Sequence, residues 1–175
     1  MVGQPRRCRT GMTNSETSSS EVTEQERLFS IAFDLPDDIA AYAPAPAEKI
    51  WAAKTEVKME VEVRNIPFYV KSIAYGDIVR VRVDHDRREL VFDEFVAESG
   101  NSTLRILLKD QSVVSELQSV LRMHGCDWEI DANEVLLAVD VPATGDFRAL
   151  STALDELHEA GLIGVQEAAI SNRHR

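Results

Sequence analysis

The sequence contains no apolar run close to the ~20 residues that a membrane-spanning helix requires, so we expect no membrane association. Arg6, Arg7 and Arg9 are not followed by the apolar segment of a secretory signal. Cysteine is nearly absent as well, because Cys8 and Cys126 are too few for a disulfide framework. Low cysteine use is typical of reduced intracellular proteins. These absences together predict a cytoplasmic protein.

Positive charge is also scarce, because 19 Lys and Arg residues face 30 Asp and Glu residues and leave a net charge of −11. The deficit is concentrated in residues 110–175, which carry four basic and twelve acidic side chains. An acidic surface repels the phosphate backbone, which argues against a nucleic-acid partner. The same surface attracts basic proteins, so we expect any protein partner to bind the acidic C-terminal part.

The residue types needed for catalysis or metal binding form no recognisable pattern. The sequence has no C-x-x-C or H-x-x-x-H pair, no P-loop and no G-x-S-x-G stretch. Its four histidines lie in a polar turn, near the ends of predicted helices and in the C-terminal tail. We therefore predict no catalytic residues, no metal site and no cofactor.

Alternating apolar residues dominate the first half of the chain. Residues 1–25 are rich in Ser, Thr and Glu, and we expect them to be a disordered, dispensable tail. Beyond them, the period-2 pattern predicts strands at 27–34, 49–56, 57–65, 78–84 and 90–98. The proline-rich residues 35–48 indicate a surface connection, and residues 66–77 a connector with one short helical turn.

The second half of the chain has a different pattern of apolar residues, in which helical and strand periodicity alternate. Asp110 and Asp146 are suited to cap two amphipathic helices, which Gly125 and Gly161 would end. Strands are predicted at 103–108, 126–130, 134–141 and 163–170. The resulting order of strand, helix, strand, strand, helix and strand is typical of a ferredoxin-like unit.

The predicted fold class is therefore α+β. A small, antiparallel, β-barrel-like sheet in residues 26–101 is followed by a ferredoxin-like βαββαβ unit in residues 102–170 and a tail, residues 171–175. A barrel is expected because short strands with one apolar face each can bury those faces by closing on themselves.

The stretch ESGNSTLR, residues 98–105, lies between the two halves and is the first candidate site. Glycine lets a ligand approach the backbone, hydroxyls bond to it, and an arginine fork suits a carboxylate or phosphate. The alternative is a bulge or crossover in which the hydroxyls bond to nearby backbone groups. The candidate ligand-binding residues here are Ser99, Gly100, Ser102, Thr103 and Arg105.

Aromatic residues allow two interpretations. Trp51 lies in a predicted strand, and Phe68, Tyr69 and Tyr75 cluster in the connector. The first interpretation is that these aromatic side chains pack in the hydrophobic core. The alternative is an aromatic wall beside ESGNSTLR, with Arg105 or Arg64 at the charged end of a pocket.

Four short motifs follow one another along the chain: E-x-x-W at 48–51, N-I-P-F-Y at 65–69, G-D-I-V at 76–79 and S-G-N-S-T-L-R at 99–105. Over about residues 27–170 the sequence thereby resembles the bacterial domain-of-unknown-function family 4265. It departs from the family pattern at Tyr69, where a second Phe is expected, and at Asn101, where a His is expected. The resemblance implies a shared fold and no particular reaction. The motifs contribute four further candidate ligand-binding residues: Trp51, Asn65, Phe68 and Asp77.

Two functions are compatible with these observations. The first is a non-catalytic protein-binding or regulatory module, favoured by the acidic C-terminal part and the missing catalytic pattern. The alternative is a small enzyme or ligand sensor with an anion-binding site at the junction of the two halves. A pocket lined by Trp51, Ser102 and Arg105 would favour the alternative, and a filled junction the first.

Arg105 shares one face of its predicted strand with the apolar Leu107. We therefore expect its side chain to be partly covered and to need an acceptor. The acids that are near in sequence, Asp93, Glu94 and Glu98, are the expected partners.

Cys126 follows Gly125 and begins an alternating strand. We expect a small buried thiol that stays reduced. No disulfide to Cys8 is expected.

Overall fold

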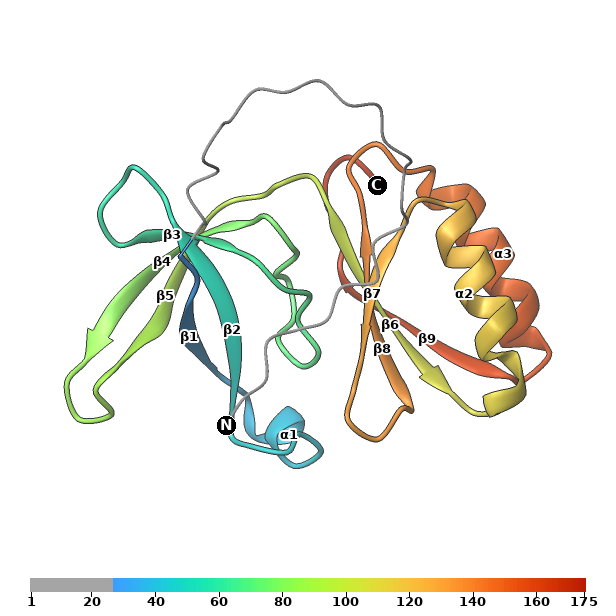
Figure 1. Ribbon diagram of the computed structural model, residues 1–175, viewed down its shortest axis with the longest axis horizontal. Coiled ribbons are helices and arrows are strands. Elements are labelled where there is room, and N and C mark those ends of the chain that lie inside the picture. The colour runs from blue at the N-terminus through green and yellow to red at the C-terminus, as the bar shows by residue number, and fades with distance from the viewer. Residues whose placement is uncertain (1–26) are drawn as a thin grey trace, which may run out of the picture.

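The structure is a computed structural model that describes residues 27–175. It is a mixed α+β chain with mostly antiparallel strands, arranged in a five-stranded and a four-stranded sheet that stand side by side (Figure 1). The predicted fold class is thus confirmed at this level. The predicted tail, residues 1–25, and Cys8 lie outside the described residues.

The first sheet contains β1 (Phe29–Asp34), β2 (Ala47–Lys54), β3 (Glu60–Val63), β4 (Ile78–Asp84) and β5 (Glu89–Ala97). Neighbours in sequence pair antiparallel. β1 and β5 pair in parallel through Ala32 and Val91, which closes the strands into a barrel. Its interior is filled by the inward-facing residues of the period-2 pattern, among them the fully buried Ile31, Ile50 and Val79.

Two local expectations in this half are wrong, and one predicted connection contains a helix that was not predicted. β3 starts at Glu60 rather than at residue 57, because Met59 has a φ of 66° and interrupts the extended backbone. A short helix, α1 (Asp37–Ala40), interrupts the predicted surface connection. The connector 66–77, all of which is described, contains bends and turns but no helical turn.

The second sheet has the order β7-β8-β6-β9 and is formed from β6 (Ser102–Leu108), β7 (Asp127–Ile130), β8 (Leu136–Val141) and β9 (Ile163–Ala169). A 3-10 turn, η1 (Gln111–Val113), leads into α2 (Val114–Met123), and α3 (Phe147–Glu159) precedes β9. The predicted caps are confirmed. The Asp110 carboxylate accepts from Ser112 N, and that of Asp146 from Ala149 N.

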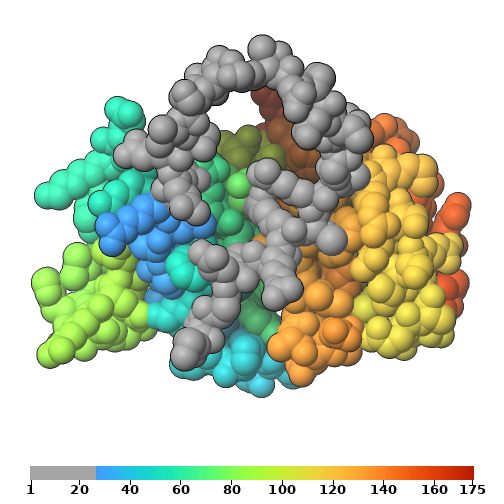
Figure 2. Space-filling view, in the orientation of Figure 1, coloured from blue at the N-terminus to red at the C-terminus, as the bar shows by residue number. Residues whose placement is uncertain are grey.

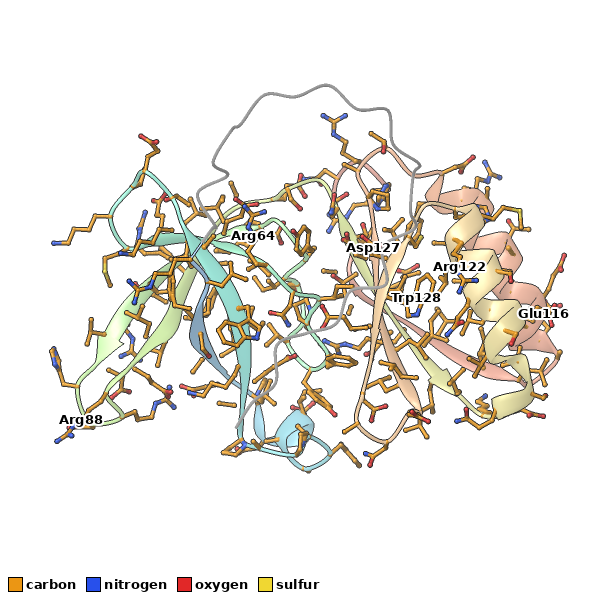
Figure 3. The ribbon with its side chains drawn as sticks, viewed as in Figure 1. Arg64, Arg88, Glu116, Arg122, Asp127 and Trp128 are labelled. Carbon is orange, nitrogen blue, oxygen red and sulfur yellow. The ribbon has the colours of Figure 1, made fainter. Side chains whose placement is uncertain are left out.

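Both long helices lie on the side of the four-stranded sheet that faces away from the barrel (Figure 1). Their apolar stripes, with the buried Leu117, Leu121 and Leu154, pack against β6 and β8. Trp128 packs against the same core, and the Arg122 guanidinium carbon lies 5.4 Å from its ring centroid (Figure 3). The barrel half and the helical half each make up one side of the visible surface (Figure 2). The opposite face of the sheet is turned towards the barrel half (Figure 1).

Cys126 is a free, buried cysteine of this core, as expected. Burial, followed by the carboxylates of Asp140 and Asp127, raises the pKa of its thiol from 9.0 to about 12. Because the thiolate is the reactive form, we expect iodoacetamide at neutral pH to modify Cys126 at least about 100-fold more slowly in the native than in the unfolded protein. Equal rates in the two states would contradict this burial.

The same shift predicts a pH dependence of stability. Because the folded state favours the neutral thiol, its contribution is complete below pH 9.0 and is lost as the pH rises towards about 12. The free energy of unfolding should therefore fall more steeply above pH 9.0 in the wild-type protein than in Cys126→Ala. Denaturant titrations at several pH values measure this difference, and parallel pH profiles would refute it.

Candidate functional site

The carboxylate of Glu48, in β2, holds the connector between β3 and β4. It accepts hydrogen bonds from the backbone N–H groups of Phe68 at 2.6 Å and of Tyr69 and Val70 at 2.8 Å each. Consecutive N–H groups around one anion form a nest. Sequence reasoning did not select Glu48, and its place at the start of the E-x-x-W motif was the only signal.

The same two motifs meet a second time. The Asn65 Oδ1 accepts from Trp51 N at 2.7 Å, and Asn65 is only 6% exposed. Trp51 O in turn accepts from Arg64 N at 2.7 Å. The structure thus brings the predicted residues Trp51, Asn65 and Phe68 together beside β2.

Asp77 joins the remaining two motifs. Its Oδ2 accepts from Ala74 N at 2.8 Å, and its Oδ1 accepts from Ser99 N at 2.7 Å and lies 3.0 Å from Ser99 Oγ. Burial raises the pKa of the Asp77 carboxyl, while the N–H donors of Ser99 and Ala74 act in the opposite direction. Asp77 therefore fastens the start of β4 to the segment that links the two sheets.

Ser102 is fully buried and holds the C-terminal segment. Its Oγ accepts from Ser171 N at 2.9 Å and lies 2.8 Å from His174 Nδ1. The Ser171 hydroxyl donates to Gly100 O at 2.7 Å. Residues 171–175, assigned to a tail from the sequence, are thus packed against the junction. The Ser102–His174 pair was not expected from the sequence, and it joins a fully buried serine to a half-buried histidine.

Two further side chains of the stretch also bond to protein atoms. Thr103 is fully buried and its hydroxyl donates to Ile73 O at 3.4 Å. The Asn101 Nδ2 lies 3.0 Å from Asp140 Oδ1, and its Oδ1 accepts from Ala143 N at 3.0 Å. These contacts correspond to the crossover interpretation of ESGNSTLR.

Gly100 has a φ of +92°, and a Cβ built on it would lie 3.0 Å from Ala143 Cβ. Both features disfavour any other residue. We expect Gly100→Ala to lower the free energy of unfolding by about 1–2 kcal/mol.

Gly164→Ala is the matched control, because its nearest neighbours would lie at 3.6 and 3.7 Å and no left-handed backbone is involved. Urea denaturation of both variants tests the prediction. Equal effects of the two substitutions would contradict it.

The expected acidic partner of Arg105 is wrong. Its Nη1 donates to Gln166 Oε1 at 3.0 Å and its Nη2 donates to the carbonyl of Val70. The guanidinium bonds to the connector and to β9 rather than to β5, a strand of the other sheet. Glu94 of β5 pairs with Arg80 instead. Burial lowers the pKa of Arg105, and the nearby Glu48 carboxylate opposes this shift.

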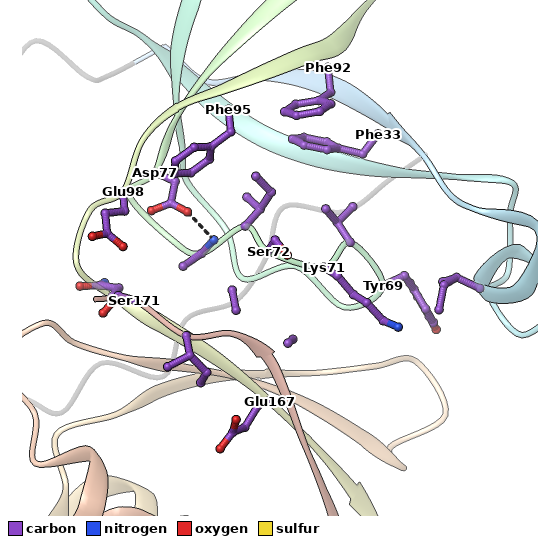
Figure 4. A pocket seen from close by; sticks show the side chains of 18 of the residues that line it. Phe33, Tyr69, Lys71, Ser72, Asp77, Phe92, Phe95, Glu98, Glu167 and Ser171 are labelled. Atoms are coloured by element: carbon purple, nitrogen blue, oxygen red, sulfur yellow. Dashed lines mark hydrogen bonds between the residues drawn. The ribbon is translucent and has the colours of Figure 1, made fainter. Parts of the chain in front are cut away.

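A large hollow remains between the two halves, and we call it the interlobe cleft (Figure 4). Its volume is about 1120 Å³. Phe33, Phe92 and Phe95 line it from the barrel, Glu167 lines it from β9, and the connector with Lys71 lies between them. The Phe33 and Phe92 rings stack with centroids 4.7 Å apart.

Two strand edges border the interlobe cleft. β9 is the last strand of its sheet, and its Ala168 carbonyl accepts from Ser72 N at 2.8 Å. In the described residues, β5 pairs with β1 only at Val91, so that its later residues pair with β4 alone. Phe95 and Val96 of this segment are 46% and 37% exposed.

A second hollow, of about 580 Å³, lies between the start of β2 and the β7–β8 loop. We call it the aromatic pocket, because its lining includes Tyr42, Trp51, Phe68 and Tyr69. The Phe68 and Tyr69 ring centroids are 6.4 Å apart.

Only four of the nine candidate ligand-binding residues line one of the two hollows. Asp77 lines the interlobe cleft, while Trp51, Asn65 and Phe68 line the aromatic pocket. Five line neither hollow: Ser99, Gly100, Ser102, Thr103 and Arg105. A pocket shared by Trp51, Ser102 and Arg105 is therefore not among these two.

Across residues 27–175, no three His, Cys, Asp or Glu side chains gather closely enough to hold a metal ion. The helices of this described part are all too short or too polar to span a bilayer.

Comparisons with known proteins identify a family and a structure of similar fold, but they assign no activity. The model of the family described as "Domain of unknown function (DUF4265)" matches residues 48–165. A structure described as "Novel crystal structure of a hypothetical protein from Neisseria gonorrhoeae" is similar, with a TM-score of 0.65 and 18% identity over 85% of this chain and 97% of that one. At this identity the likeness shows the fold alone. No curated protein matches.

Proposed function

The chain belongs to the DUF4265 family, and from the geometry of its interlobe cleft we propose that it is a non-catalytic module that binds an extended segment of a partner protein. The observation that carries the proposal is the pair of strand edges, β5 and β9, on either side of an apolar cleft. An extended segment adds its backbone hydrogen bonds to such an edge and places alternate side chains in pockets.

The charge of the cleft supports a basic partner segment. Asp38, Glu98 and Glu167 line it, and its cations are Lys71 and Arg175. β9 belongs to the acidic C-terminal part, which agrees with the charge asymmetry of the sequence. Opposite charges would raise the association rate at low salt.

The anion-binding sensor or small enzyme has less support. The hydroxyls of Ser102 and Thr103 and the guanidinium of Arg105 bond to protein atoms. A ligand at the junction would have to displace these contacts.

The proposal also includes a more specific fold type and a cellular location. The element order and the strand order β7-β8-β6-β9 support a ferredoxin-like unit behind a small β-barrel. A cytoplasmic location is supported by the low cysteine content of the sequence.

Selection of random displayed peptides on the full-length protein tests the binding function. We expect the selected peptides to alternate apolar with other residues, to carry Lys or Arg, and to slow amide exchange along β9. Their affinity should fall by about tenfold or more in Phe95→Ser, because an aromatic anchor is lost.

The matched control is Val83→Ser, because Val83 is 49% exposed on β4 and does not line the cleft. It should leave the affinity unchanged. Equal binding to both variants, or failure to select any peptide, would overturn the proposed function.

A further inference from the structure

The aromatic pocket combines π faces with negative charge. Tyr42, which is 87% exposed, and the half-buried Trp51 stand at one side, on the segment from α1 to β2. Phe68 and Tyr69 come from the connector. Aromatic faces attract cations, and several faces around one hollow are the usual recognition site of quaternary ammonium groups.

Three carboxylates contribute to the lining: Glu48, Glu129 and Asp131, against a single cation, Lys49. Lys49 forms an ion pair with Glu89, so its charge is partly neutralised. Burial and then the Asp131 and Glu48 carboxylates raise the pKa of the Tyr69 hydroxyl, and the nearby Arg105 acts in the opposite direction. Acidic side chains therefore outnumber cations in the lining of the pocket.

The carboxylates are held apart rather than turned towards one point. Glu48 is held by the connector N–H groups, and Asp131 Oδ1 accepts from Val135 N and Leu136 N at 2.9 Å each. No three potential metal ligands converge within residues 27–175. A diffuse organic cation suits such an arrangement better than a metal ion, because it needs a negative field and apolar walls but no fixed ligand geometry.

We propose that the aromatic pocket binds an organic cation of the quaternary ammonium class. Its methyl groups would contact the rings of Trp51 and Tyr42, and the charge would be balanced by Asp131 and the neighbouring carboxylates. No residue of β5 or β9 lines the aromatic pocket, although Tyr69 lines both hollows, so this site goes beyond the proposed peptide-binding function.

The two tryptophans provide the readout, because Trp51 lines the pocket and Trp128 packs against the helix-covered core instead. In a two-dimensional proton–nitrogen NMR spectrum of the full-length protein, choline chloride should shift the Trp51 indole signal saturably. The Trp128 signal should stay in place. A Trp128→Phe variant assigns the two signals. Sodium chloride at equal ionic strength and 3,3-dimethylbutan-1-ol, the neutral isostere of choline, should have no such effect.

Two substitutions test the walls and the charge separately. Tyr42→Ala removes an exposed ring and should weaken choline binding about two- to fivefold. Asp131→Asn keeps the Oδ1 acceptor, removes the charge and should weaken binding roughly threefold or more. Asp146→Asn is the matched control, because it makes the same change at the N-cap of α3 and should leave the dissociation constant unchanged.

A peptide with trimethyllysine, compared with free choline and with the unmodified lysine peptide, identifies the source of the cation. Tighter binding of the trimethyllysine peptide assigns the site to a partner side chain, and tighter binding of choline assigns it to a free small molecule. Equal shifts with sodium chloride, equal affinity for the neutral isostere, or no effect of Tyr42→Ala and Asp131→Asn would overturn the proposal.

Discussion

Replacing Glu48 with alanine is expected to lower the free energy of unfolding by about 3–5 kcal/mol. The substitution leaves three backbone donors, on Phe68, Tyr69 and Val70, without the carboxylate that now binds all of them. A hydrogen bond to a charged group contributes about 1.5–3 kcal/mol. The three bonds share one partly accessible carboxylate, so water would replace some of them and the total stays below their sum.

Urea or thermal denaturation measures this loss, and Glu48→Gln keeps the test informative if the alanine variant does not fold. Glutamine retains one oxygen acceptor but turns an N–H₂ donor towards the remaining N–H groups, so an intermediate loss is expected. Glu56→Ala, at an exposed position of the β2–β3 turn, is the control and should change stability by less than about 0.5 kcal/mol. Similar losses in Glu48→Ala and Glu56→Ala would show that the nest contributes nothing.

The four motifs have one structural explanation in common. Glu48 and Asn65 bind the E-x-x-W strand to the N-I-P-F connector, and Asp77 binds the G-D-I-V strand to Ser99. Ser102 then binds the C-terminal segment. These bonds fix the connector and the segment between the two sheets, and three motif residues, Tyr69, Asp77 and Asn101, also line the interlobe cleft.

The features of the fold that could be predicted are local ones. The caps at Asp110 and Asp146 act within three residues, and the alternation of β4 depends on neighbouring positions only. The start of β3 was missed because nothing in the sequence marks Met59 for a positive φ, which is usually a property of glycine or asparagine. α1 was missed because it has four residues and follows Pro36 in a segment with the composition of a loop.

The site was harder to predict because its contacts join residues that are far apart in sequence. Glu48 reaches donors more than 19 positions away, and Ser102 meets His174 across 72 positions. Strand periodicity indicates which face a side chain occupies, but it does not indicate which element covers that face. For this reason the burial of Arg105 was anticipated while its partners were not.

Arg105→Ala should lower the free energy of unfolding by about 2–4 kcal/mol. Arg105 is 6% exposed, and its guanidinium joins β9, through Gln166, to the connector, through Val70 O. The truncation leaves the half-buried Val70 carbonyl without this donor and a cavity where the side-chain stem packed. Both consequences act on the contact between the two halves.

Arg105→Met separates these two contributions. Methionine fills much of the stem's volume and removes a buried charge whose Nε has no hydrogen-bond partner among the described residues. It should therefore recover at least half of the stability lost in Arg105→Ala. Arg82→Ala, on the exposed side of β4, is the control and should cost less than about 0.5 kcal/mol. Unchanged denaturation curves for Arg105→Ala would show that Arg105 does not stabilise the fold. Burying a guanidinium costs desolvation free energy, so a buried arginine without a stabilising role would again be a candidate ligand-binding residue.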